Sequence, residues 1–272
     1  MLHAGLDMGS LWTKAVVLAD GEIAGWHVMP SGESSRDTAT AALAAALAPL
    51  KAVLGDVASV AATGAGKGEA TQAGQANREA TEVLCAARGL SHLHPEARGV
   101  IEIGGESTRV VRLDDQGGVL EFAKNDKCAS GTGIFLDAMG KLMGVELGEM
   151  GPLSLTSTED VQITSTCVVF AESEVVSQVH RQTPKQDILR GIHRSIAVRV
   201  HGLVNRLQLD GRTAMVIGGL ALNSGILRCL EELMYTPLAV PDQPQIVTAL
   251  GAALIASENP RGSSDAAAGG NA

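Results

Sequence analysis

The chain contains few aromatic residues. Phe, Trp and Tyr together make up 2% of its 272 residues, whereas the hydrophobic types as a whole make up 45%. A sizeable core must therefore be built from Ala, Val, Leu and Ile side chains. The length allows one large domain or two of ordinary size.

Basic residues are scarce relative to acidic ones. The chain has 21 Lys and Arg against 30 Asp and Glu, which gives a formal net charge of −9 with neutral histidines. An acidic surface repels phosphate backbones, so nucleic acid is not an expected partner.

The sequence also lacks a long uninterrupted apolar run and a basic leader. Its longest apolar tract, TATAALAAALAPLKAVL, contains a proline and a lysine and is mostly alanine. This composition indicates a helix of a soluble protein and no membrane span. The first residues, MLHAGLDMGS, lead straight into a predicted strand. Because four cysteines in such a chain do not indicate a disulfide framework, we expect a cytoplasmic protein.

Two segments of the chain are similar to each other. Residues 6–16 read LDMGSLWTKAV and residues 101–111 read IEIGGESTRVV. The matching pairs are Asp7 with Glu102, Gly9 with Gly104, Thr13 with Thr108, and Lys14 with Arg109. Each copy predicts a strand, a tight glycine turn and a second strand, with an acidic residue ending the first strand. The repeat favours two related halves facing a cleft; alternatively, two hairpins share a glycine turn for structural reasons alone.

The rest of the chain intersperses predicted strands and helices. Further strands are expected at 57–63 and 214–217, and helices at 37–54, 76–88, 133–143, 171–182, 185–207, 224–233 and 245–257. This order predicts a layered α/β fold. We assign residues 1–95 to a first α/β lobe and 96–256 to a second. Residues 257–272 are small and polar, and we expect a disordered tail there.

The two similar glycine turns predict a site for a nucleotide polyphosphate. A glycine turn after a strand leaves backbone N–H groups free to face an anion, and no Cβ blocks close approach. An acid at the strand end can hold Mg²⁺ against the phosphates. The expected binding residues of the first turn are Gly9, Ser10, Thr13 and Lys14, and those of the second are Gly104 and Gly105. Asp7 and Glu102 are the candidate catalytic acids.

A third glycine cluster, VIGGLALNSGI at 216–226, again follows a predicted strand and precedes a helix. There Gly218, Gly219 and Asn223 are expected to let an adenosine lie against backbone. No G-x-x-x-x-G-K-[ST] motif occurs, which disfavours a P-loop protein. The three turns together point to the actin-like and sugar-kinase-like nucleotide fold.

The four cysteines fall into two groups. Cys85 and Cys229 lie in helical patterns, where cysteine usually behaves as a small buried hydrophobe. Cys128, in NDKCASGTG, and Cys167, after ITST, each precede a predicted helix whose N-terminus would stabilise a thiolate.

A 4Fe–4S cluster commonly takes four thiolates, and a two-fold dimer would supply two of these from each chain. The alternatives are two unrelated loop cysteines or a single reactive thiolate at Cys128. His193 and His201 lie along a long predicted helix and fit surface or packing positions better than metal sites.

The chain resembles a known family, the ATP-dependent activators of 2-hydroxyacyl-CoA dehydratases with the related ATPase subunits of benzoyl-CoA reductase. The motifs that carry the resemblance, from about Ala4 to Ala256, are GLDMGSLWTK, ATGAGK, NDKCASGTGIFLD, STCVVFAESEVVSQV, DILRGIHRSIAVRV, GGLALNSGI and ALGAALIA. The two cysteine motifs are the most specific of them.

The resemblance implies an actin-like ATPase that is a homodimer or pairs with a homologous ATPase subunit. It implies one 4Fe–4S cluster per dimer with Cys128 and Cys167 as ligands, contacts to a cofactor from the loop glycines Gly131 and Gly133, and ATP with Mg²⁺. A ferredoxin or flavodoxin would supply electrons, and ATP hydrolysis would drive single low-potential electrons to an acyl-CoA dehydratase or an aromatic acyl-CoA reductase.

Some positions depart from the family pattern. The second turn usually reads Asp-Ile-Gly-Gly-Gln-Asp but here reads EIGGES, so Glu102 is longer than the usual aspartate, Glu106 adds charge and Ser107 replaces an acid. In the first turn, Leu11 and Trp12 replace small residues. Two other functions therefore stay open: a small-molecule kinase of the sugar- or acetate-kinase type, and a partner subunit that binds ATP without hydrolysing it.

Overall fold

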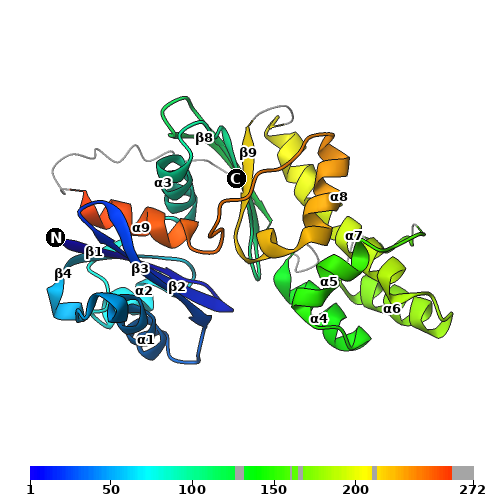
Figure 1. The fold of residues 1–272 in the computed structure, drawn as a ribbon, viewed down its shortest axis with the longest axis horizontal. Coiled ribbons are helices and arrows are strands. Elements are labelled where there is room, and N and C mark those ends of the chain that lie inside the picture. Colours follow the sequence, from blue (N-terminus) through cyan, green and yellow to red (C-terminus); the bar gives the residue numbers. More distant parts are fainter. Residues whose placement is uncertain (126–131, 160, 165–167, 210–212, 259–272) are drawn as a thin grey trace.

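The computed structural model describes residues 1–125, 132–159, 161–164, 168–209 and 213–258. In these residues the chain forms two β-sheets with helices packed on them (Figure 1). The first sheet is built from the N-terminal part of the chain and the second from the strands that follow residue 98.

The first sheet has the strand order β3-β2-β1-β4-β5. Its strands are β1 (Leu2–Met8), β2 (Trp12–Ala19), β3 (Glu22–Pro30), β4 (Val57–Thr63) and β5 (Arg78–Glu79). β1, β2 and β3 form an antiparallel meander, whereas β4 runs parallel to β1 and β5 parallel to β4. The predicted hairpin at 6–16 is therefore confirmed, and so is the strand at 57–63.

Helix α1 (Ser35–Leu47) covers one face of this sheet. Half of its six buried residues are alanines, and the small size of Gly25 lets β3 approach the carbonyl of Ala46. The helix ends earlier than the predicted 37–54, because Pro49 lies in the 3₁₀ turn Ala48–Leu50 that follows and cannot donate a helical hydrogen bond. A second 3₁₀ turn, Leu54–Asp56, leads into β4, and the short helix α2 (Lys67–Gln72) follows that strand.

The second sheet has the order β8-β7-β6-β9 and repeats the plan of the first. Its strands are β6 (Gly99–Ile103), β7 (Thr108–Leu113), β8 (Val119–Asn125) and β9 (Ala214–Ile217). β6, β7 and β8 are antiparallel, and β9 is parallel to β6. This confirms the predicted hairpin at 101–111 and the strand at 214–217.

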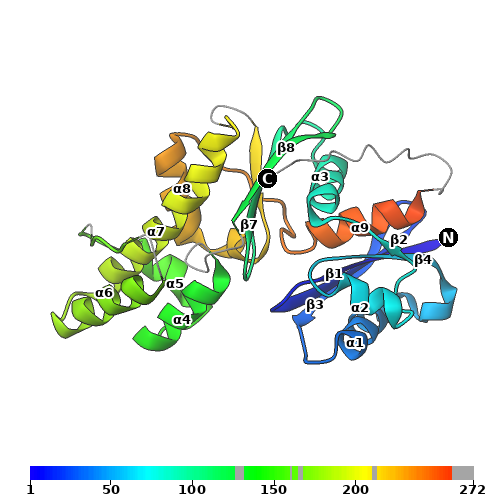
Figure 2. The same ribbon diagram turned by 180° about the vertical axis from the view of Figure 1, so that it is seen from behind.

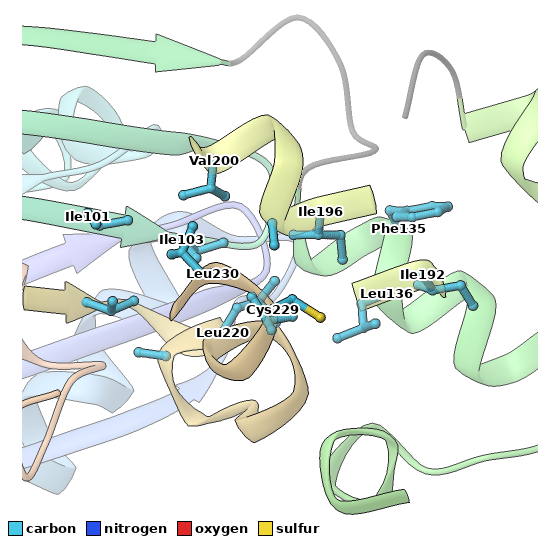
Figure 3. Packing of buried hydrophobic residues seen from close by; sticks show 14 of the residues in the cluster. Ile101, Ile103, Phe135, Leu136, Ile192, Ile196, Val200, Leu220, Cys229 and Leu230 are labelled. Carbon is cyan, nitrogen blue, oxygen red and sulfur yellow. The ribbon is translucent and has the colours of Figure 1, made fainter. Parts of the chain in front are cut away.

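A group of helices lies on one side of the second sheet, some of them packed on the sheet and others, such as α6, packed on neighbouring helices. They are α4 (Gly133–Met143), α5 (Leu147–Ser154), α6 (Val168–His180), α7 (Lys185–Arg206) and α8 (Ser224–Met234), with the 3₁₀ turn η4 (Gly219–Leu222). Figure 3 shows Phe135 and Leu136 of α4, and Ile192 and Ile196 of α7, in the core that they share with Ile103 of β6.

Two helices lie between the sheets. α9 (Val247–Ser257) packs on β1, β2 and β4, and α3 (Glu82–Leu93) packs on α9 and on the second sheet (Figures 1 and 2). The two helices cross where Gly251 faces the carbonyl of Cys85 and Gly89 faces that of Val247, and a Cβ at either glycine would collide with backbone. The last helix thus returns the chain to its first sheet.

Helix α3 begins later than the predicted 76–88. Thr81 is its N-cap, with a side chain that accepts from Leu84 N, and residues 78–79 form β5.

The helices predicted at 133–143, 171–182, 185–207, 224–233 and 245–257 all form, with ends within three residues of those expected. Strands β3 and β8 and helices α2 and α5 were not predicted. None of the helices in the described residues combines the length and apolarity that crossing a membrane needs.

Candidate nucleotide site

The first glycine turn is flanked by a buried ion pair. Asp7, at the end of β1, lies directly across from Lys14 of β2, and Lys14 Nζ donates to Asp7 Oδ2 at 2.8 Å. Burial alone would lower the pKa of Lys14, but the Asp7 carboxylate outweighs it, so the pKa is raised above that of an ordinary lysine. Lys14 is therefore a fixed cation beside the turn.

The turn itself is held by side-chain hydrogen bonds from the end of β3. Ser31 Oγ donates to the carbonyl of Gly9 at 2.6 Å and lies 2.9 Å from Thr13 Oγ1. Gly9, Ser10 and Thr13 line a polar cavity of about 230 Å³. Its other lining residues are Met8, Ser31, Gly32, Ser35, Thr38, Ala65, Gly66 and Glu69.

A glycine of the ATGAGK motif lies against the same acid. Gly64 has φ +87°, and a Cβ there would lie 2.9 Å from Asp7 Oδ1 and 2.6 Å from the carbonyl of Met8. Only glycine allows this backbone to pass so close to the carboxylate. In the described part of the chain, Asp7 Oδ1 accepts no hydrogen bond, so one oxygen of this buried carboxylate has lone pairs that no protein group uses.

The second hairpin places an equivalent acid in a larger charge network. Glu102 of β6 lies across from Arg109 of β7, and Arg109 Nη1 donates to Glu102 Oε2 at 2.5 Å. Arg109 Nη2 donates to Glu82 of α3. Thr248 Oγ1 of α9 donates to Glu102 Oε1 at 2.8 Å. Both oxygens of Glu102 are therefore bound by protein groups.

Burial raises the pKa of Glu82, although the Arg109 guanidinium opposes this rise. Burial would lower the pKa of Arg109, but Glu102 and Glu82 raise it overall. One buried arginine thus compensates two carboxylates that come from different elements.

The two glycine turns meet each other. A Cβ on Gly105 would lie 2.8 Å from Leu11 Cδ1, so the first turn touches the second directly. The residues predicted for the two phosphate turns are thus brought together.

The third glycine turn lies at the end of the neighbouring strand β9. Gly218 has φ +90° and packs against the carbonyl of Ile103, where a Cβ would approach to 2.6 Å. Its N–H donates to Pro244 O at 2.9 Å, and Gly219 begins η4. Asn223 is the N-cap of α8, with Oδ1 accepting from Ile226 N at 3.0 Å. The Asn223 side chain is therefore committed to the start of the helix.

The predicted cluster ligands Cys128 and Cys167, and also Gly131, lie outside the described residues. Gly133 is described: its N–H donates to Gly104 O at 3.0 Å, and Ile134 N donates to Gly105 O at 2.9 Å. The first turn of α4 is therefore hydrogen-bonded to the second glycine turn. In the described part of the chain, no three His, Cys, Asp or Glu side chains gather into a metal-binding group.

The other two cysteines are buried and unbonded to each other, as expected for core residues. Burial raises the pKa of the Cys85 thiol to about 12. His193 is also a packing residue, completely buried in α7.

Sequence reasoning missed Glu82, Thr248 and Ser31. None of them belongs to the repeat, and each reaches the site from outside the two hairpins, Thr248 from the last helix of the described chain. A charged residue beside a helix N-cap, as in Thr81–Glu82, is a common capping pattern and gave no signal of a link to Arg109.

Two sheets of the same plan, with glycine turns that meet between them, define the actin-like and sugar-kinase-like ATPase fold. A glucokinase of the ROK family from Streptomyces griseus matches with a TM-score of 0.55 at 15% identity, over 94% of this chain and 98% of that one, which shows the fold alone.

The chain belongs to the BadF/BadG/BcrA/BcrD ATPase family, whose model matches residues 4–256. It is 41% identical over 260 residues to the 2-hydroxyisocaproyl-CoA dehydratase activator of Clostridioides difficile, covering 94% of this chain and 95% of that protein. It is 36% identical over 205 residues to one of the benzoyl-CoA reductase subunits of Thauera aromatica, covering 73% of this chain and 71% of that protein. The structure of the 2-hydroxyisocaproyl-CoA dehydratase activator from Clostridium difficile with bound ADPNP matches with a TM-score of 0.88 at 40% identity over 94% of both chains.

Proposed function

We propose that this protein hydrolyses ATP to pass single low-potential electrons from a 4Fe–4S cluster to a partner acyl-CoA enzyme. The partner would be a 2-hydroxyacyl-CoA dehydratase or an aromatic acyl-CoA reductase. Membership of a family with dehydratase activators and a benzoyl-CoA reductase component supports this choice of partner.

The observation that carries the proposal is the pair of hydrogen bonds between the second glycine turn and α4. The carbonyls of Gly104 and Gly105 accept from the N–H groups of Gly133 and Ile134. The segment with Cys128 directly precedes that helix in the chain. A nucleotide that moves the turn would therefore also move the end of the cysteine segment.

The residues present fit a nucleotide with Mg²⁺. The turns around Gly9, Gly104 and Gly218 are tightly folded, since a Cβ at Gly9 or Gly218 would lie only 2.6 Å from a backbone carbonyl oxygen. We infer that phosphates and adenosine lie against the backbone of these turns. Asp7 would hold the metal ion through Oδ1, which is not used by Lys14. Lys14 would offset phosphate charge. Glu102 would have to give up its hydrogen bond from Thr248 or from Arg109 before that oxygen could bind the ion.

The two lobes that would close on the nucleotide are those expected at 1–95 and 96–256, except that α9 packs on the first sheet and α3 also packs on the second. Closure must stem from a higher affinity of ATP for the closed state than for the open one. The 4Fe–4S cluster, held by Cys128 and Cys167 of two paired chains, would supply one-electron chemistry when bound. This chain's own residues would bind the phosphates, place Mg²⁺ and shift the cysteine segments.

Anaerobic purification followed by iron and phosphate analysis tests the proposal. We expect brown protein with iron and acid-labile sulfide equivalent to one 4Fe–4S cluster per dimer, and ATP hydrolysis that rises when an acyl-CoA enzyme accepts electrons. A ferredoxin or flavodoxin should reduce the cluster. Colourless, iron-free protein that phosphorylates a sugar or acetate would favour the kinase, and iron without phosphate release would favour a non-hydrolysing partner.

A further inference from the structure

A buried histidine outside the glycine turns lies where three helices meet. His193 belongs to α7, Ser154 ends α5, and Asn223 caps α8. His193 Nδ1 is 2.8 Å from Ser154 Oγ, and His193 Nε2 is 3.4 Å from Asn223 Nδ2. All three side chains are buried.

The hydrogen bonds at this junction have one consistent direction. Asn223 Oδ1 already accepts from Ile226 N, so its amide group faces His193. An amide NH₂ only donates, so His193 Nε2 accepts and the ring proton lies on Nδ1. Nδ1 then donates to Ser154 Oγ, which in turn donates to Gly151 O at 2.8 Å. The chain of donors runs from the α8 cap to α5.

The junction requires a neutral ring. Burial, with a smaller contribution from the charge of Arg190, lowers the pKa of His193 to about 3. A protonated ring would point a second N–H at the amide of Asn223, whose NH₂ cannot accept it.

The three helices are packed too closely to move independently at this point. A Cβ on Gly225 of α8 would overlap both His193 Nδ1 and Ser154 Oγ. A Cβ on Gly151 of α5 would lie 2.9 Å from Ser224 Oγ. In a close-packed junction, a shift of one helix has to be taken up by its neighbours.

Each of these helices follows, in the chain, either the third glycine turn or one of the two cysteine segments. α8 follows the third glycine turn, α7 follows α6, which begins one residue after Cys167, and α5 follows α4, which comes after Cys128. We propose that His193 is a positioning residue that couples the third glycine turn to both cysteine segments. This inference rests on the proposed function.

The test uses two substitutions of His193, each of which keeps one of its two hydrogen bonds and removes the other. His193→Gln offers an acceptor to Asn223 and loses the donor to Ser154, whereas His193→Asn keeps a donor for Ser154 and loses the acceptor. The measurement is the rate of iron release to a chelator from the intact protein, with ADPNP and without it. We expect the nucleotide-dependent change in this rate to fall about tenfold in His193→Asn, as for one lost buried hydrogen bond, and to fall less in His193→Gln, which loses only the link to α5.

Two further variants separate coupling from folding. Asn223→Ser keeps a cap for α8 but has no NH₂ for His193, so it should behave like His193→Asn and decides the matter if that variant is unstable. Ser195→Ala removes another buried hydroxyl of α7, which donates to Ile192 O within the same helix, and should keep the wild-type response.

A wild-type nucleotide response in both His193→Asn and Asn223→Ser would overturn the inference and leave the proposed function intact. Wild-type protein without iron would overturn both. An equal loss of response in Ser195→Ala would show a general effect of destabilising α7 and would also overturn the coupling role.

Discussion

Lys14 and Arg109 occupy the same place in the two hairpins, each directly across from the acid of the neighbouring strand. Lys14 donates to Asp7, whereas Arg109 donates to Glu102 and also to Glu82. The forked guanidinium can serve two carboxylates at once, which an ammonium does less well. The base of the second hairpin therefore also binds a carboxylate from α3, the half-buried Glu82.

Removing Arg109 should strongly destabilise the fold. Arg109→Ala leaves two carboxylates without their cation, and we expect a loss of about 3–5 kcal/mol in the free energy of unfolding. Urea unfolding of the purified protein measures it. Arg112→Ala is the matched control on the same strand, because its partner Glu121 is exposed and the pair should contribute about 1 kcal/mol or less. Equal losses in the two variants would contradict the network.

Substitution of Asp7 should stop ATP hydrolysis without removing iron. Asp7→Asn keeps the shape and a hydrogen-bond acceptor but removes the charge that would hold Mg²⁺, so phosphate release should fall about 100-fold or more. Iron content reports whether the cluster survives. Asp20→Asn, at an exposed turn, is the control and should keep full activity. Phosphate release at the wild-type rate in Asp7→Asn would show that this acid has no catalytic role.

The cysteine assignment predicts a clear difference in iron content. Cys128→Ser and Cys167→Ser should each lose the cluster and weaken the dimer, as shown by iron analysis and size-exclusion chromatography. Cys85→Ala should retain both properties, since the Cys85 thiol is buried in α3 and held protonated by its surroundings. Wild-type iron in Cys167→Ser would refute the ligand assignment.

The crossing of α3 and α9 should tolerate no side chain. Gly251→Ala would force a methyl group into the carbonyl of Cys85, and we expect a loss of several kcal/mol, at least about 3, in the free energy of unfolding. Gly202→Ala, near the C-terminal end of α7, meets nothing within 4 Å and should stabilise the protein by about 0.5–1 kcal/mol through helix propensity. Thermal unfolding of wild type and both variants measures these changes. A Gly251→Ala variant as stable as wild type would contradict this packing.

Stability should depend on His193 in mildly acidic solution. The folded pKa of about 3 lies below the ordinary histidine value of 6.5, so the unfolded chain binds a proton first as pH falls. The stability contribution is therefore fully present above 6.5 and is lost between 6.5 and about 3, by about 1.4 kcal/mol per pH unit. The difference between wild type and His193→Gln in urea unfolding should shrink from about pH 7 to about pH 5.5. A constant difference would rule out a buried neutral histidine.

The fold followed from the sequence where local signals and packing agree. The repeat of acid, glycine turn and base predicted both hairpins, and periodic apolar residues predicted most helices. The predicted start of α3 at residue 76 was wrong. The pattern at 76–81 favours a helix, but residues 78–79 pair with β4 in the first sheet. Strand β8 was missed because its outward residues Leu120 and Phe122 are apolar and exposed, so its polarity does not alternate.

The site was predictable only where the motif repeats. Asp7 and Glu102 stood out because each ends a strand before a glycine turn. Thr248 and Glu82 could not be found this way, because their role depends on how α9 and α3 pack between the sheets. His193 looked like one more polar residue of a long helix, and only the junction with Ser154 and Asn223 gives it a role.

The contact of α3 with α9 through Gly89 and Gly251 also limits how the two halves of the molecule can move. Rotation about that crossing preserves the backbone contact, whereas a sliding motion would break it. A rotation about the crossing would displace each element in proportion to its distance from it. In Figure 1 α6, the helix that follows Cys167, lies far out on the other side of the second sheet, so such a rotation would move it farther than the elements near the crossing.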